Sequence, residues 1–104
     1  MIYKNSEIFQ HGLNDGLYGY TYLNSNWNSE NLKDYSNGLI IGKIQLSIKE
    51  NNFLNCTYEL MTYCYLIHIW IKNSYKSLNF QVDNKSDFKK FKELTGIKSI
   101  KRQY

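Results

Sequence analysis

The segment that most constrains the fold is residues 58–82, which hold the densest run of apolar, β-branched and aromatic residues in the chain. From residue 63 to 71 every residue except His68 is aromatic, aliphatic or Cys, whereas residues 75–82 alternate between apolar and polar side chains. A continuous apolar run is typical of a strand buried on both faces, and alternation is typical of a half-buried strand. The turn-forming pair Asn73-Ser74 lies between them, so the sequence predicts a β-hairpin whose first strand is central.

Glycine spacing predicts a pair of packed helices in the first half of the chain. Three glycines between residues 12 and 19 follow one another at spacings of four and three. In a helix they share one face and allow another backbone to approach closely, whereas in a loop they would be turn glycines. A second helix is predicted from about residue 32 to 49, with Gly38 and Gly42 four residues apart. Residues 44–48 also alternate as a strand would, but Glu50-Asn51-Asn52 makes a natural helix stop.

Residues 8–46 contain the motif Gly12-x-x-x-Gly16-x-x-Gly19, an Asn-rich link, and then Tyr35-x-x-Gly38-x-x-x-Gly42. This motif resembles the small ribosome modulation factor proteins and related short bacterial and phage proteins. The resemblance implies a helical hairpin whose glycines lie where the helices cross, and it implies ribosome binding. The chain departs from that family because its link contains no Pro and because two lysines face three acids here, a balance of −1.

The clearest helix signals belong to residues 86–95. Asn84 or Ser86 can cap the first turn, and Gly96 is placed where a C-cap glycine belongs. The apolar stripe, at spacings of three residues, consists of Phe88, Phe91 and Leu94. Such a stripe is typical of a helix that packs one side on a core.

These elements predict a single α+β domain over residues 1–104. We expect an N-terminal glycine-packed helical pair, a small antiparallel sheet built on the 58–82 hairpin, and an amphipathic helix over 86–95 whose apolar stripe packs on that sheet. Asn, Lys, Ile and Tyr dominate the composition, whereas Ala and Pro are absent. The abundant residues have A/T-rich codons, so genomic base composition explains this bias, with a functional tyrosine-rich surface as the alternative.

Positive charge is concentrated in the last third of the chain. Residues 72–104 carry nine Lys and Arg against three acids, a balance of +6, whereas residues 1–71 carry four lysines against six acids, a balance of −2. A basic face is typical of proteins that bind nucleic acid or an acidic protein surface, with an ordinary solvated lysine face as the alternative. The candidate binding residues on this face are Lys85, Lys89, Lys90, Lys92, Lys98, Lys101 and Arg102.

Aromatic residues near the Asn-rich link are candidate interface anchors, because Tyr and Trp are favoured at binding hot spots. Tyr18, Tyr20 and Tyr22 precede the link, and packing on the helices is the alternative for each tyrosine. Trp27 is isolated among Asn and Ser, so we expect it to be exposed. Trp27 and Tyr20 therefore join the candidate binding residues.

The sequence contains no catalytic motif, neither a Gly-x-Ser-x-Gly elbow nor a phosphate-binding loop nor a His-Glu-x-x-His pattern. On an extended strand Cys64 and His68 would stand about 13 Å apart, too far for one metal ion. We expect His68 to be a core or strand-edge histidine with a satisfied ring nitrogen. His11 with Asp15 would orient an imidazole but provides no nucleophile. We therefore predict a protein that is not an enzyme and has no catalytic residues, metal or cofactor.

No stretch resembles a signal peptide, and no apolar run approaches the ~20 residues of a membrane-spanning helix. Two cysteines do not make a disulfide framework. These features predict a cytoplasmic protein with reduced thiols and no membrane partner.

The leading hypothesis is a non-enzymatic small binding protein that occupies a macromolecular surface. Its target would be a protein or ribonucleoprotein, with RNA backbone contacts through the C-terminal lysine face. By analogy, such a domain fits a phage or mobile-element inhibitor of a host nucleic-acid machine, of which anti-CRISPR proteins are one kind. The alternatives are an RNA- or ribosome-binding protein, and a small basic ribonuclease toxin that would use Arg102, Lys98, Tyr104 and His68.

Overall fold

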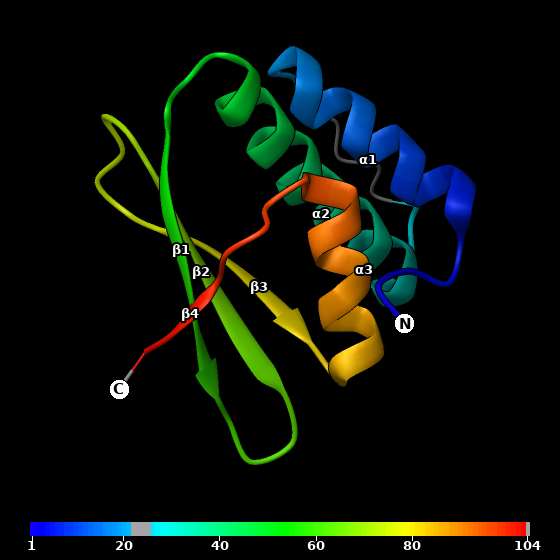
Figure 1. The fold of residues 1–104 in the computed structure, drawn as a ribbon. Coiled ribbons are helices and arrows are strands. Elements are labelled where there is room, and N and C mark those ends of the chain that lie inside the picture. Colours follow the sequence, from blue (N-terminus) through cyan, green and yellow to red (C-terminus); the bar gives the residue numbers. More distant parts are fainter. Residues whose placement is uncertain (22–25, 104) are drawn as a thin grey trace.

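The computed structural model describes residues 1–21 and 26–103, so the predictions for Tyr22 and Tyr104 lie outside it. In chain order the elements are α1 (Ser6–Tyr18), α2 (Ser29–Lys49), β1 (Phe53–Leu60), β2 (Tyr65–Ile71), β3 (Leu78–Val82), α3 (Lys85–Thr95) and β4 (Lys101–Arg102) (Figure 1). The predicted α+β fold, with its N-terminal helical pair and C-terminal helix, is confirmed. None of the described helices combines the length and apolar character that crossing a membrane requires.

The α1–α2 pair is held together by glycines on both helices. A Cβ atom built on Gly12 would overlap the backbone carbonyl oxygen of Tyr35, and one built on Gly38 would overlap that of Phe9. Gly16 and Gly42 meet in the same way, so two Gly-x-x-x-Gly faces bring the backbones into direct contact. The third glycine of the first group differs from the prediction. Gly19 ends α1 in the left-handed conformation, with φ 77°, and does not belong to the contact face.

The sheet has the strand order β3-β2-β1-β4. β2 pairs antiparallel with β3 and lies inside the sheet, which confirms the predicted hairpin and its central first strand. The turn between them contains Asn73, whose φ of 64° suits Asn. β1 and β2 form a second hairpin, closed by a hydrogen bond of 2.8 Å from the Met61 N–H to the Cys64 carbonyl. The short β4 was not predicted, and it pairs parallel with β1, so the sheet is mixed.

The three described helices lie on one side of the sheet (Figure 1). The core between the two layers contains fully buried side chains from both, including Ile41, Ile44, Ile67, Ile69, Phe80, Val82 and Phe91. The prediction that β2 is buried on both faces is wrong. Trp70, on the face that no helix covers, is 41% exposed, and its neighbour His68 is only partly buried. The apolar run reflects one covered face and one face of large, partly exposed side chains.

α3 begins one residue earlier than predicted. The Asn84 side chain accepts a hydrogen bond of 2.8 Å from the Asp87 N–H, so Asn84 is the N-cap. Gly96 ends the helix with φ 77°, as expected for a C-cap glycine. Phe91 stacks at a tilt on Phe80 of β3, with ring centroids 5.1 Å apart. These contacts fix α3 across the sheet and thereby place its lysines.

Candidate binding groove

A groove of about 380 Å³ lies between α3 and the first β-hairpin. Its floor is formed by three aromatic side chains, Tyr58 of β1, Tyr65 of β2 and Phe88 of α3, and Ile100 lines it from the segment before β4. The ring centroids of Phe88 lie 5.1 Å from Tyr58 and 5.5 Å from Tyr65, with interplanar angles of 78° and 69°. These edge-to-face contacts are the arrangement that aromatic pairs favour, so the rings support one another without being fully buried.

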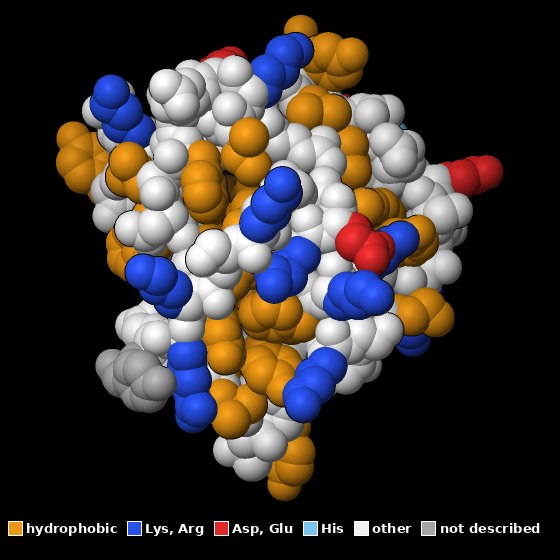
Figure 2. All heavy atoms as spheres, in the orientation of Figure 1, with side chains coloured by type: hydrophobic (Ala, Val, Ile, Leu, Met, Phe, Trp, Pro, Cys, Tyr) orange, Lys and Arg blue, Asp and Glu red, His pale blue; other side chains and the backbone are white. Residues whose placement is uncertain are grey.

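Lysines of α3 surround this aromatic floor. Lys85, Lys89 and Lys92 line the groove at positions i, i+4 and i+7 of the helix, so they share its exposed side with Phe88. Figure 2 shows hydrophobic side chains in the lower half of the view with Lys and Arg side chains on both sides of them. Ile100, which precedes β4, lines the groove at the end nearest that strand. In β4, Arg102 is the register partner of Tyr58.

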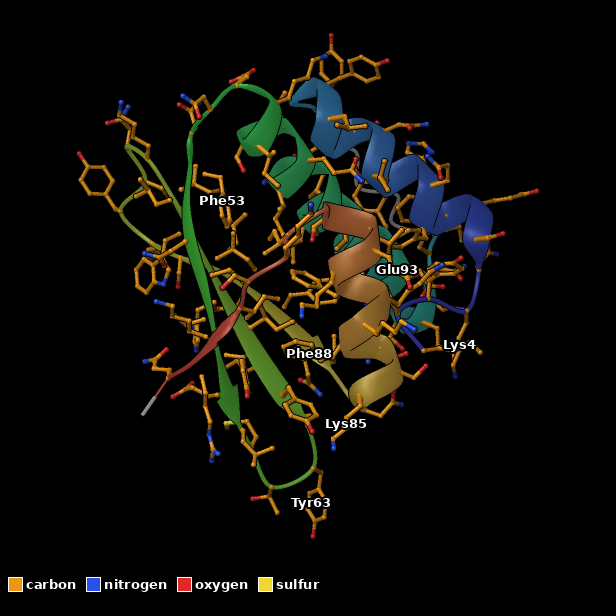
Figure 3. The ribbon with its side chains drawn as sticks, viewed as in Figure 1. Lys4, Phe53, Tyr63, Lys85, Phe88 and Glu93 are labelled. Atoms are coloured by element: carbon orange, nitrogen blue, oxygen red, sulfur yellow. The ribbon has the colours of Figure 1, made fainter. Side chains whose placement is uncertain are left out.

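The α3 lysines have no ion-pair partner among the residues that the structure describes. Two acids lie on the same helix, but neither faces the groove. The Asp87 carboxylate is buried and binds the Met1 ammonium group at 2.8 Å. Glu93 lies on the other side of α3 from Phe88 (Figure 3). Like charges four residues apart, such as Lys85 and Lys89, repel one another, so the groove carries positive charge that no ion pair among the described residues neutralises.

The structure brings only some of the predicted binding residues together. Lys85, Lys89 and Lys92 meet at the groove, whereas Lys90 is exposed on α3 without lining it. Lys98 and Arg102 are exposed on the C-terminal segment. Lys101 lines a different depression at the β1–β4 edge together with Thr57, its partner in the parallel register. The predicted lysine face therefore does not form one site, because only three of its seven residues line the groove.

The predicted aromatic anchors lie elsewhere. Trp27 is half-buried, with its ring centroid 5.0 Å from that of Tyr35, so the prediction of an exposed, isolated tryptophan is wrong. Tyr35 belongs to the helical pair, and Trp27 covers it where the chain enters α2. Tyr20 is 68% exposed but does not line the groove. Tyr18 is 74% exposed, so the alternative that it packs on the helices does not hold for this tyrosine.

Sequence reasoning missed the aromatic floor because it assigned Phe88 to the core and gave Tyr58 and Tyr65 no role beyond the sheet. One signal was available for Phe88. It lies three residues after Lys85, one before Lys89 and four before Lys92, so an aromatic side chain stands inside the lysine stripe. Phe88 lies on the same side of the helix as Lys85 and Lys92, so the spacing indicates that this side stays at least partly accessible.

The hairpin beyond the groove ends in an exposed apolar tip. Leu60, Met61 and Tyr63 are all exposed, and Tyr63 is 90% exposed. Figure 3 shows Tyr63 at the end of the hairpin, beyond Lys85 at the start of α3. The tip therefore lies next to the groove but contributes no lining residue to it.

A larger depression, about 670 Å³, runs along α1. It is lined by Ser6, Glu7, Gln10, His11, Asn14 and Asp15, all from that one helix. His11 Nε2 lies 3.2 Å from Asp15 Oδ2, which confirms the predicted pair, and the Tyr35 hydroxyl donates a hydrogen bond of 2.6 Å to the same oxygen. This depression is the open side of a helix, whereas the groove at α3 is built from three elements.

Two further reactive side chains, His68 and Cys56, are engaged or buried. His68 Nε2 lies 2.8 Å from Glu59 Oε2, and Nδ1 lies 2.9 Å from Asn79 Oδ1, so the expected satisfied ring nitrogen is confirmed. Burial raises the pKa of the Cys56 thiol to about 12, which keeps it protonated. Within residues 1–21 and 26–103, no three His, Cys, Asp or Glu side chains gather as metal ligands would.

No known protein family, curated protein or solved structure matches the chain. The resemblance of residues 8–46 to ribosome modulation factor proteins is therefore a prediction without a test. The helical hairpin that the resemblance implies is present, and four of the motif's five glycines, all except Gly19, lie at the helix contact.

Proposed function

We propose that the chain is a non-enzymatic small binding protein that occupies an anionic macromolecular surface through the groove between α3 and the first hairpin. The observation that carries this proposal is a set of lysines, with no ion-pair partner among the described residues, around a partly exposed aromatic floor. The positive charge of these lysines attracts an anionic partner. Burial of the aromatic side chains against that partner adds to the free energy of binding. The target proposed for this groove is the acidic or phosphate-bearing surface of a protein or ribonucleoprotein.

The anatomy of the groove supports binding over chemistry. Protein interfaces combine an apolar, aromatic centre with a polar rim, and here Tyr58, Tyr65 and Phe88 form the centre and the lysines the rim. Neither described histidine lines the groove. The two ring nitrogens of His68 lie within hydrogen-bond distance of Glu59 and Asn79. His68 lies with Trp70 on the face of β2 that no helix covers. No observation favours the ribonuclease hypothesis, and the inhibitor of a host nucleic-acid machine stays an analogy.

The proposal is tested by mapping anion binding on the protein with ¹H–¹⁵N correlation spectra. Two probes are titrated separately at low salt, poly-L-glutamate and a single-stranded oligouridylate. With at least one probe, the largest amide shifts should fall at Tyr58, Tyr65, Ile100 and residues 85–92. Shifts that centre on the α1 depression, or that spread evenly over all exposed lysines, would contradict the proposal. Either pattern would show that the groove binds anions no better than the rest of the surface does.

A further inference from the structure

We propose that the groove binds a single-stranded segment of nucleic acid, with bases against the aromatic floor and phosphates against the α3 lysines. This inference rests on the proposed function and names the ligand class of the same groove. Proteins that bind single strands without sequence preference combine these two features, a positively charged groove and aromatic side chains on which bases stack. Here both features belong to one site, because Phe88 and the three lysines share one side of α3.

The aromatic floor favours a ligand with flat rings. Three of the residues that line the groove are aromatic, and Ile100 is the aliphatic one among them. A base presents a π-face to such side chains whatever its identity. An acidic peptide would satisfy the lysines but would leave the aromatic floor with few matching groups.

Two hydroxyl groups add polar contacts to this floor. Neither the Tyr58 nor the Tyr65 hydroxyl has a hydrogen-bond partner among the described residues. No described side-chain polar atom is both buried and without a partner, so these hydroxyls reach solvent. Each can donate a hydrogen bond to a phosphate or a base, while its ring remains available for stacking.

The lysine wall suits one strand whose bases are free. Lys85 and Lys92 are seven residues apart, which is about 10.5 Å along a helix axis, and Lys89 lies between them. The wall can therefore contact several successive phosphates. In a duplex the bases are stacked and paired, so they cannot reach the aromatic floor, whereas the bases of a single strand can be splayed out onto aromatic side chains.

The test measures fluorescence anisotropy of labelled oligouridylate and oligothymidylate of about 12 nucleotides, the range of common single-strand sites. Both strands should bind, and three contacted phosphates should give a slope of log K against log salt of about −2. Tyr65→Leu keeps an apolar side chain but removes the ring, and it should weaken binding about tenfold. Tyr63→Leu makes the same change at the exposed tip and should bind as the unchanged protein does.

Two further measurements keep the result interpretable. The urea midpoint of Tyr65→Leu shows whether that variant is folded, and Tyr65→Phe, which keeps the ring, should retain most of the affinity. Poly-L-glutamate, added at matched charge, should displace the oligonucleotides poorly, and a duplex of equal length should bind more weakly than either strand. Tighter binding of oligouridylate would identify RNA as the ligand, and tighter binding of oligothymidylate would identify DNA. Binding of either strand supports the inference.

Three outcomes would overturn the inference. If poly-L-glutamate displaces the oligonucleotides efficiently and Tyr65→Leu binds as tightly as Tyr63→Leu, the groove is a site for acidic protein segments, and the proposed function stands without the nucleic acid. If the duplex binds as tightly as the single strands, base contact with the aromatic floor is refuted. If neither oligonucleotide nor poly-L-glutamate binds, the inference and the proposed function both fail.

Discussion

Replacing Gly42 with Ala tests the backbone contact between α1 and α2. A Cβ atom at Gly42 would overlap the carbonyl oxygen of Leu13, and it would lie 2.9 Å from the Leu17 nitrogen and 3.0 Å from the Gly16 Cα. Ordinary contacts of a Cβ atom begin near 3.4 Å. All three neighbours are backbone atoms, so no side-chain rotation can relieve the overlap. The two helices must move apart to accept one methyl group.

The cost follows from two opposing effects. Overpacking a close contact costs about 1–3 kcal/mol and occasionally more, whereas Ala in place of Gly favours a helix by up to about 1 kcal/mol. Separation of the helices also loosens the buried Phe9 and Leu13 beside the contact. We therefore expect a net loss of about 2 kcal/mol from a folding free energy of about 5–15 kcal/mol. For a domain of this size, that loss corresponds to a fall in Tm of about 8–16 °C.

Urea unfolding followed by circular dichroism measures this loss. Ser36→Ala is the matched control, because Ser36 is an exposed small residue of the same helix, and its change should stay within about 0.5 kcal/mol. A Gly42→Ala protein as stable as the Ser36→Ala protein would refute the glycine-mediated contact. The helices would then have to cross at a distance that leaves room for a side chain at position 42.

Two further predictions concern the thiols and the α3 cap. Burial raises the pKa of Cys56 to about 12, so an alkylating reagent at pH 8 should modify the less buried Cys64 and leave Cys56 intact. Peptide mass spectrometry measures the labelling of each cysteine. Equal labelling of both would contradict the burial of Cys56. The Cys56 thiol has a higher pKa in the folded protein than in the unfolded chain, so the unfolded chain loses this proton first as the pH rises. The folded protein should therefore keep its full stability below pH 9.0 and lose part of it as the pH rises from 9.0 toward 12. Asn84→Ala should lower the free energy of unfolding by about 1 kcal/mol through loss of the N-cap, and an unchanged urea midpoint would show that the cap contributes nothing.

Local signals explain why the helices were predictable from the sequence. Asn84 and Gly96 bracket α3 because each satisfies backbone groups at a helix end without help from the rest of the fold. The glycine spacing predicted the α1–α2 contact because i and i+4 residues share a helix face whatever surrounds them. The 58–82 hairpin followed from its apolar run, its alternation and its turn residues. Each of these features depends on residues close together in the sequence.

The remaining features depend on contacts between distant segments. The apolar run of β2 reads the same whether one face or both are covered, so the exposure of Trp70 could not be read from it. β4 is only two residues long and exists because β1 offers a free edge. The aromatic floor needs β1, β2 and α3 together. Trp27 was misjudged because its polar sequence neighbours gave no sign of the Tyr35 ring, which lies in α2.

The most direct test of the binding groove compares two charge reversals. Lys89→Glu places a negative charge in the groove, and Lys76→Glu makes the same change on the exposed turn between β2 and β3. The affinity of each variant for a labelled single-stranded oligouridylate is measured at one low salt concentration. We expect Lys89→Glu to abolish measurable binding and Lys76→Glu to cause only the modest loss that follows from the change in net charge. Equal losses in the two variants would contradict a dedicated groove and would reduce the lysines to a general positive surface.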